Sequence, residues 1–138
     1  MSTATDARGS QSRGRLFRSM QAQGDVPAVG SSARTLGARF DDIEVDDDGL
    51  VRPGTGGISV APDEATNLPA HRLLPEYGGT GKDPVWWIGE DDLGDRLSYR
   101  PDPDPDTPNH GFIEPAHTMT FEEYQQALQS TQARWRRL

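Results

Sequence analysis

The sequence predicts a single α+β domain of short strands closed by a C-terminal helix. Three observations support this fold class. Only 33% of the 138 residues are hydrophobic, while 15 are glycine and 11 are proline, a composition typical of many loops and few long helices. Several short segments alternate apolar and polar residues, whereas a helical period appears only near the C-terminus. A chain of this length buries one core but not two.

Residues 1–14 are expected to form a disordered leader, and residues 15–138 to form the domain. The leader is rich in Ser, Thr, Ala, Gly, Gln and Arg and offers no apolar face. It also lacks the apolar region of a secretory signal peptide. No apolar run in the chain approaches the roughly 20 residues that span a bilayer. Any export is therefore expected to need no signal peptide.

The charge and the absence of cysteine exclude some kinds of site. The formal net charge is −8, so non-specific attraction to nucleic acid or to an anionic membrane is not expected to supply the main binding energy. There is no cysteine, so neither a disulfide framework nor a zinc–thiolate site can form. The three histidines give no metal-binding pattern without it.

The first strand is predicted at Arg15–Met20, "RLFRSM". Alternation places Leu16, Arg18 and Met20 on one face and the intervening residues on the other. An arginine on a strand most often lies at the sheet surface, which is the first expectation for Arg18. A loop rich in Gly, Pro and Ser is predicted over 22–32.

The segment Gly49–Asp63, "GLVRPGTGGISVAPD", reads as a turn, a short strand at Ile58–Val60 and a proline-opened helix start. Gly56 and Gly57 remove side chains just before Ser59, so that another backbone or a ligand can approach closely. The alternative is a glycine bulge at a sheet edge, with Ser59 a surface hydroxyl.

Two further strands are predicted at Pro84–Gly89 and Arg96–Arg100, both rich in aromatic residues. Trp86 and Trp87 should face opposite sides, so at most one of them lies in the core. Pro101–Pro108, "PDPDPDTP", alternates proline with aspartate and predicts an extended, solvated loop that can cover a cleft.

The last strand is predicted at His110–Pro115, "HGFIEP". Alternation puts His110, Phe112 and Glu114 on one side and Ile113 on the other.

The C-terminal segment has the clearest helical pattern. Thr120 and Glu123 form a capping box, and Met119 and Tyr124 are spaced as a hydrophobic staple. Apolar positions then recur at helical spacing as far as Leu138. The last turn holds three arginines that would face the negative end of the helix dipole: Arg134, Arg136 and Arg137.

Two other motifs are incomplete. The acidic run Asp41–Asp48 resembles a calcium loop only loosely, because Glu44 stands at the first ligand position and Thr55 at the twelfth, where glutamate is needed. Gly78–Asp83 resembles a phosphate-binding loop, but Glu76 replaces its first glycine and Asp83 its final Ser/Thr. An acidic turn and a plain turn are the simpler interpretations.

Three segments together resemble the ADP-ribosyltransferase-like toxins of bacterial type VI secretion. They are "LFR" in the first strand, "DGLVRPGTGGISV" and "HGFIEPAHTM", followed by an arginine-rich C-terminal segment. Their order is the same as in that family, and they cover the chain from Arg15 to Leu138.

The resemblance implies an ADP-ribosyltransferase-like split antiparallel β-core with surrounding helices. It implies a toxin that uses NAD as its substrate and transfers ADP-ribose to an acceptor macromolecule. It further implies neutralisation by a cognate immunity protein, a monomeric free state and no association with membranes. Such an effector is cytoplasmic in its producer, is secreted without a signal peptide and acts in the cytoplasm of the target cell.

The positions that match the family pattern are Arg18, Gly56, Gly57, Ser59, His110, Pro115 and Met119. Cleavage of the nicotinamide–ribose bond passes through an oxocarbenium-like state, so the site must hold the diphosphate and stabilise developing positive charge. Arg18 suits the diphosphate or ribose, Ser59 the ribose, and Tyr99, Trp86 or Phe112 the nicotinamide ring. The predicted catalytic residues are Ser59, His110 and Glu114; the predicted NAD-binding residues are Arg18, Gly56, Gly57, Ser59 and Tyr99.

Alternatives remain open at this point. His110 is equally explained as a capping or core histidine, and Glu114 as a solvated edge residue. The family pattern has threonine directly before the serine, where this chain has Ile58. That difference favours a non-enzymatic interaction module on the same fold. An RNA 2′-phosphotransferase-like enzyme is a third possibility, disfavoured by the acidic charge.

Overall fold

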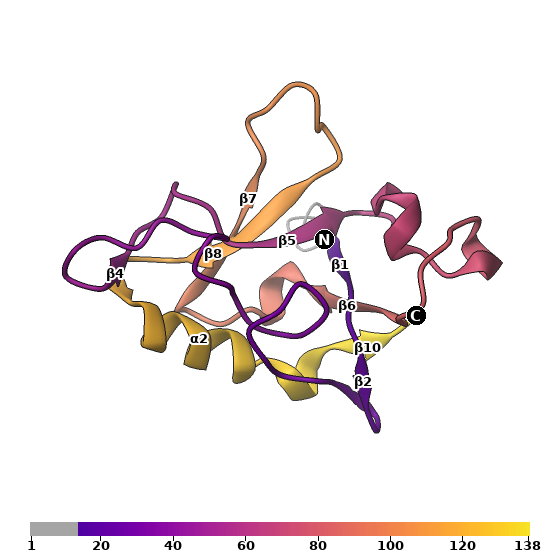
Figure 1. The fold of residues 1–138 in the computed structure, drawn as a ribbon, viewed down its shortest axis with the longest axis horizontal. Helices are drawn as coiled ribbons and strands as arrows, with labels where there is room; N and C mark the ends of the chain where they lie inside the picture. Colours follow the sequence, from indigo (N-terminus) through magenta and orange to yellow (C-terminus); the bar gives the residue numbers. More distant parts are fainter. Residues whose placement is uncertain (1–13) are drawn as a thin grey trace, which may run out of the picture.

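The computed structural model describes residues 14–138, and the leader predicted at residues 1–14 therefore lies almost wholly outside the described residues. Six strands form one antiparallel sheet in the order β10-β6-β1-β5-β8-β7 (Figure 1). The strands of this sheet are β1 Arg15–Ser19, β5 Ile58–Pro62, β6 Val85–Gly89, β7 Leu97–Pro101, β8 Gly111–Pro115 and β10 Arg136–Arg137.

Shorter elements complete the fold. Two small ladders pair β2 (Ala22–Gln23) with β3 (Val26–Pro27) and β4 (Leu50–Val51) with β9 (Met119–Thr120). The described residues contain one α-helix, α2 (Phe121–Gln129). The 3₁₀ turns are η1 Ala65–Asn67, η2 Ala70–Arg72, η3 Pro75–Tyr77, η4 Glu90–Asp92 and η5 Gln132–Arg134. The α+β class is thus correct, but within residues 14–138 the expected set of surrounding helices is reduced to this one helix and short turns.

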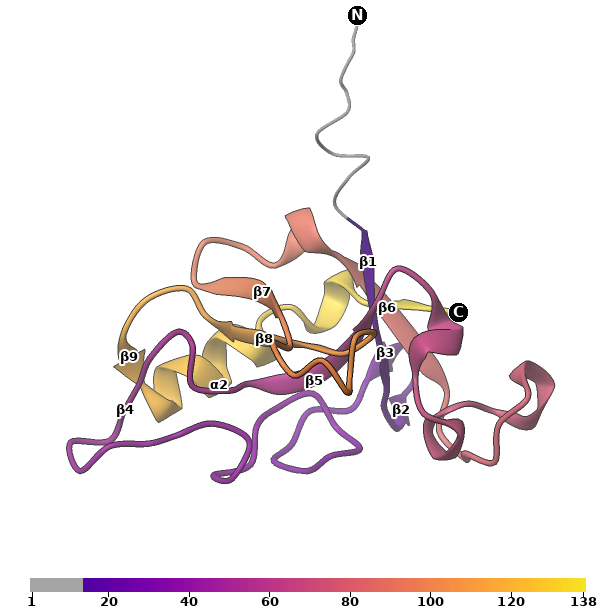
Figure 2. The same ribbon diagram turned by 90° about the horizontal axis from the view of Figure 1, so that it is seen from above.

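The sheet carries a hydrophobic cluster on each face. The larger cluster includes Leu16, Met20 and Trp86 of the sheet with Tyr124 and Leu128 of α2. The smaller cluster, on the opposite face, consists of Phe17, Ala61, Leu73 and Val85. Figure 2 shows α2 along one side of the sheet and the loop that contains η1 to η3 at its end. The alternation predicted for the first strand is therefore confirmed for its apolar residues.

The tryptophans behave as their alternation predicts. Trp86 is fully buried in the larger cluster, and its indole N–H donates to the carbonyl of Met20 at 2.9 Å. Trp87 is half-buried and packs against the smaller cluster. Only Trp86 belongs to the main core, because neighbouring strand residues face opposite sides of the sheet.

Strand β5 pairs with β8 along the first half of its length and with β1 along the second half. Its first residues, Ile58 to Val60, pair with β8. Its last residues pair with β1, where Phe17 lies opposite Ala61 and Leu16 opposite Pro62. From Arg18 onward, β1 no longer pairs with β5 but continues alongside β6. The two strands diverge at Arg18 and Ser59, and the polar groups facing that gap need other partners.

The two glycines before Ser59 admit atoms of the protein itself. Gly56 and Gly57 have φ values of 125° and 149°, which L-residues with a side chain rarely adopt. A Cβ on Gly56 would lie 2.4 Å from the carbonyl oxygen of Asp42, and one on Gly57 would lie 2.4 Å from that of Ile113. Close approach is thus the correct reason for the glycines, but the approaching groups are backbone carbonyls and not a ligand.

A tyrosine hydroxyl lies between β5 and β8 beside Gly57. Tyr124 of α2 accepts a hydrogen bond from the N–H of Ile58 at 3.1 Å and donates one to the carbonyl of Ile113. Ile58 and Ile113 face each other in the ladder. Burial raises the pKa of Tyr124 well above its ordinary value, so the phenol stays a donor as well as an acceptor. Helix α2 is thus hydrogen-bonded to β5, the strand that contains Ser59.

The C-terminal helix is shorter than predicted. The capping box is confirmed, with Glu123 N–H donating to Thr120 Oγ1 at 3.0 Å and Thr120 N–H to Glu123 Oε1 at 2.9 Å. The helix ends at Gln129, and Arg136 and Arg137 form β10, opposite Trp87 and Trp86 of β6. Their guanidinium groups lie 5.7 and 5.6 Å from those ring centroids. The predicted helix-dipole role of these arginines is therefore wrong, because pairing with β6 and stacking on its tryptophans replaces the last helical turns.

Two loop predictions are refined by the structure. The segment predicted as a loop over 22–32 contains the β2–β3 hairpin. The Pro/Asp segment is turned and not extended, because aspartate side chains accept backbone hydrogen bonds within it, from Asp104 N–H to Asp102 Oδ1 and from Asp106 N–H to Asp104 Oδ1, both 2.9 Å. None of the helices in residues 14–138 has the length and apolarity required to cross a bilayer.

Candidate functional site

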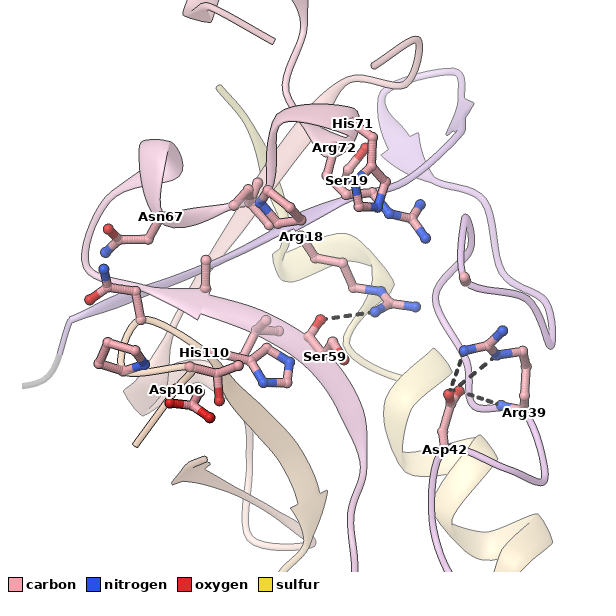
Figure 3. Close-up of a pocket in the computed structure, with 18 residues that line it drawn as sticks. Arg18, Ser19, Arg39, Asp42, Ser59, Asn67, His71, Arg72, Asp106 and His110 are labelled. Carbon is pink, nitrogen blue, oxygen red and sulfur yellow. Dashed lines mark hydrogen bonds and ion pairs between the residues drawn. The ribbon is translucent and has the colours of Figure 1, made fainter. Parts of the chain in front are cut away.

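A cavity of about 560 Å³ opens where β1 and β5 diverge (Figure 3). Its walls come from β1, β5, the loop with η1 and η2, the Pro/Asp loop and the loop before β4. The charged and hydrogen-bonding side chains that line it are Arg18, Ser19, Arg39, Asp42, Ser59, Asn67, His71, Arg72, Asp106, Thr107, Asn109 and His110. The chain therefore brings three of the predicted site residues, Arg18, Ser59 and His110, to one cavity.

Arg18 is the central cation of this cavity. Only 6% of its surface is exposed, so the expectation of a surface position on the sheet is wrong. Its Nη1 donates to the carbonyl of Ser59 at 2.9 Å and its Nη2 to that of Thr35 at 2.9 Å. These bonds fill the gap left where β1 separates from β5. Its Nε is buried without a hydrogen-bond partner among the described residues.

The charge of Arg18 is not neutralised by any carboxylate in contact with it in residues 14–138. The pKa of Arg18 is lowered to about 10, chiefly by burial; Asp42 opposes this effect in part, and the like charge of Arg72 adds to it. Asp42 is itself engaged by Arg39, with Arg39 Nη2 2.9 Å from Asp42 Oδ1. At neutral pH Arg18 remains protonated. A buried cation that lacks a counter-ion is costly unless an anion binds next to it.

Arg72, together with the Arg39–Asp42 pair, was not among the predicted site residues. Arg72 lies in the η2 turn and faces the cavity (Figure 3). Its guanidinium forms no hydrogen bond or ion pair within the described part of the chain, although it is close enough to Arg18 to affect its pKa. No local pattern marks this arginine, because only the path of the loop after β5 brings it opposite Arg18.

Ser59 presents its side chain to the cavity and its carbonyl to Arg18. It is exposed, whereas its neighbours Ile58 and Val60 are buried. Its position opposite Phe112 in the ladder fixes which way it faces. The alternative, a glycine bulge at a sheet edge with Ser59 as a surface hydroxyl, does not fit this position, because Ser59 lies within the β5–β8 ladder and lines the cavity.

His110 lies at the rim of the cavity, directly before β8. Its Nδ1 lies 2.7 Å from Asp102 Oδ2, and its ring contacts Phe112 edge-on with centroids 4.9 Å apart. It is neither a helix cap nor a residue of either hydrophobic cluster. Figure 3 shows its ring beside Ser59.

The remaining predicted site residues do not line the cavity. Glu114 is 7% exposed and accepts hydrogen bonds from Gly54 N–H at 2.8 Å and Arg100 Nε at 2.9 Å. It is therefore not a solvated edge residue, and the structure does not place it beside His110 in the cavity. Tyr99 packs against the larger core cluster, and Gly56 and Gly57 face the backbone contacts described above.

Among the described residues, the cavity lining forms no metal-binding cluster, and the predicted catalytic carboxylate, Glu114, is not part of that lining. Within residues 14–138, no group of three or more His, Cys, Asp or Glu side chains is arranged to hold a metal ion. The cavity carboxylates are Asp42 and Asp106, set among three arginines. The site is thus suited to a ligand that carries negative charge.

Comparison with known proteins is consistent with this chemistry. No curated protein and no solved structure matches the chain. A family model described as the Tse2 ADP-ribosyltransferase toxin matches residues 15–135, which include every strand of the sheet except the last. The match covers most of the chain, and the chain therefore belongs to the Tse2 family of ADP-ribosyltransferase toxins.

Proposed function

We propose that this toxin binds NAD in the cavity between β1 and β5 and transfers its ADP-ribose to an acceptor in the cytoplasm of a target cell. The observation that carries the proposal is Arg18, a buried cation that finds, within residues 14–138, neither a partner for its Nε nor a carboxylate in contact with it. A diphosphate would supply the missing negative charge. Family membership supports the class of reaction.

The cavity supplies groups for the diphosphate, for the nicotinamide ribose and for the positive charge of the transition state. Arg18 and Arg72 hold the diphosphate, because two nearby cations repel each other less once an anion lies between them. The Ser59 hydroxyl orients the nicotinamide ribose. Asp42 and Asp106, the carboxylates that line the cavity, face the positive charge that develops as nicotinamide leaves.

Glu114 supports the site from outside the cavity. Its carboxylate connects the Gly54 turn, which precedes β5, to Arg100 of β7. We assign it to holding the turn before β5 in place against β8 and β7. Ile58, at the position where the family pattern has threonine, points into the larger core cluster, so this difference removes no hydroxyl from the cavity of this chain.

A cognate immunity protein would act most simply by covering the cavity mouth. Phe40 is the most exposed large hydrophobic side chain among the described residues, at 74%, and it stacks on Phe121 with centroids 4.5 Å apart. It lies directly between the cavity residue Arg39 and the acidic segment that follows. Exposed aromatic side chains frequently anchor protein interfaces. Secretion without a signal peptide, and a monomeric free state, are parts of the same proposal.

Calorimetric titration of NAD into wild-type protein and Arg18→Gln tests the proposal. Loss of a charge-assisted hydrogen bond costs about 1.5–3 kcal/mol, so the variant should bind NAD at least about tenfold more weakly. Arg34→Gln is the matched control, since Arg34 pairs with Asp83 outside the cavity and its loss should leave the affinity unchanged. Absence of NAD binding by the wild type would support the non-enzymatic module instead.

A further inference from the structure

The Pro/Asp loop between β7 and β8 is closed by a carboxylate–imidazole pair at its two ends. Asp102 Oδ2 lies 2.7 Å from His110 Nδ1, and the backbone N–H of Asp102 donates to the carbonyl of His110 at 3.0 Å. The two side chains are 15% and 32% exposed. The pair is thus held by both side chain and backbone at the edge of the cavity.

The carboxylate of Asp102 is fixed on both of its oxygens. Oδ1 accepts from the N–H of Asp104 at 2.9 Å, and Oδ2 accepts from Thr107 Oγ1 at 2.9 Å as well as meeting His110. These hydrogen bonds, the one from Asp104 first, lower the pKa of Asp102 to about 2. Asp102 is therefore an acceptor throughout the neutral range, and it cannot rotate away without losing several bonds.

This geometry decides which nitrogen of His110 carries the proton in the neutral ring. A carboxylate at 2.7 Å requires a donor, so Nδ1 holds the hydrogen and Nε2 keeps its lone pair. Nε2 makes no hydrogen bond within the part of the chain that the structure describes. Because His110 lines the cavity, Nε2 is the ring nitrogen that remains available to a ligand there. The other ionisable groups of that cavity are Arg18, Arg39, Asp42, His71, Arg72 and Asp106.

We propose that Asp102 is a positioning residue that makes His110 Nε2 the general base of the reaction. The acceptor is then a group that loses a proton as it attacks, and we assign it as a hydroxyl group or water. This inference rests on the proposed function. The bond from ribose C1′ to the nicotinamide nitrogen breaks, and nicotinamide leaves as a neutral molecule with the electron pair. A bond from C1′ to the acceptor oxygen forms, and the acceptor proton passes to Nε2. A carboxylate acceptor would need no base, since it carries no proton at neutral pH.

Asp102→Asn should reverse the tautomer. The N–H of Asp104 holds the amide oxygen on its own side, so the amide N–H₂ faces His110 and donates to Nδ1. The proton of the neutral ring then moves to Nε2, which can no longer accept one. Asp104→Asn is the matched control: it removes the same charge from the same loop and keeps an acceptor for Asp106, but it leaves the Asp102–His110 pair intact.

Nitrogen-15 NMR of the histidine rings tests the positioning directly and without NAD. The wild type and Asp104→Asn should show His110 protonated on Nδ1 at pH 8, and Asp102→Asn should show it protonated on Nε2. Wild-type protein with its proton on Nε2 would overturn the inference whatever its activity. Thermal melts of the same variants check that each one is folded.

Nicotinamide release from NAD, with water or added methanol as the acceptor, tests the base. Asp102→Asn and His110→Gln should each be slower by about 100-fold, the double variant should be no slower than either, and Asp104→Asn should match the wild type. Affinity for NAD should change by less than twofold in each of these variants.

The outcomes separate this inference from the proposed function. A wild type that binds no NAD would refute the proposed function. A wild type that binds NAD but releases nicotinamide with neither acceptor would overturn the assignment of a hydroxyl-type acceptor. Unchanged turnover in Asp102→Asn would overturn the role of Asp102, as would a loss of NAD affinity equal to the loss of rate.

Discussion

At the scale of single residues, the site depends on polar groups that the sheet leaves unpaired. Because β1 stops pairing with β5 after Phe17, the carbonyl of Ser59 is free to accept from Arg18. The same divergence turns the Ser59 hydroxyl toward open space. One local break in strand pairing thus positions both a buried cation and an exposed hydroxyl. The functional groups lie where the regular hydrogen bonding ends.

Ser59→Ala should reduce toxicity on expression in bacterial cytoplasm while leaving the fold intact. Since Ser59 is exposed and its hydroxyl forms no hydrogen bond within residues 14–138, removal of the hydroxyl should change the free energy of unfolding by less than about 1 kcal/mol. Growth curves and thermal melts measure the two effects. Ser98→Ala, a serine of β7 that does not line the cavity, should remain fully toxic. Undiminished toxicity of Ser59→Ala would remove Ser59 from the site.

At the scale of elements, the glycine-rich segment is shaped by what packs against it. Gly57 lies against Ile113 of β8, and a Cβ added to Gly57 would lie 3.1 Å from the Tyr124 hydroxyl. That hydroxyl joins β5, β8 and α2 at one point. The segment therefore serves the site indirectly, by letting the helix and the neighbouring strand hold β5 in position.

Gly57→Ala should destabilise the protein much more than Gly54→Ala. Both glycines have a positive φ, so both substitutions introduce backbone strain of about 1–2 kcal/mol. A Cβ at position 54 meets nothing within 4 Å, whereas one at position 57 overlaps a backbone carbonyl. We expect Gly57→Ala to cost at least about 3 kcal/mol in all, measured by urea unfolding. Equal losses for the two variants would show that close packing is not the reason for Gly57.

At the scale of the whole molecule, the sheet consists of two parts that share β5. One part is β10-β6-β1 and the other is β8-β7. The cavity lies at their junction and takes residues from both, with Arg18 from the first and His110 from the border of the second. A ligand that contacts both parts should therefore hold them together.

Hydrogen exchange with and without NAD should report this coupling. Saturating NAD should slow exchange of backbone amides in β1, in β5 and in the loop with η1 and η2, because these segments surround the ligand. Amides of β10 and η5 should change little, since they lie outside the cavity lining. Protection spread evenly over the chain, or confined to β10, would contradict a site at the junction.

The local patterns of the sequence determined much of the secondary structure. The alternation in Arg15–Met20 and the aromatic residues of Pro84–Gly89 identified two central strands, and the Thr120–Glu123 capping box located the start of α2. These signals work because side-chain direction and cap hydrogen bonds depend on neighbours within a few residues. The same motifs, through resemblance, pointed to Arg18, Ser59 and His110 and to the family that the comparison confirms.

Only the tertiary structure decided where the helix ends and which residues share the cavity. The helical period runs on to Leu138, yet pairing with β6 and stacking on its tryptophans outweighs the helix propensity of the last residues. No sequence pattern near Arg72 or Asp102 indicates its role. The loop after β5 brings Arg72 close to Arg18, and the Pro/Asp loop brings Asp102 to His110. Glu114 shared a predicted face with His110, but the partners that hold it, Gly54 and Arg100, come from separate elements. Long-range contacts of this kind depend on the path of the whole chain, which alternation and spacing within one segment do not encode.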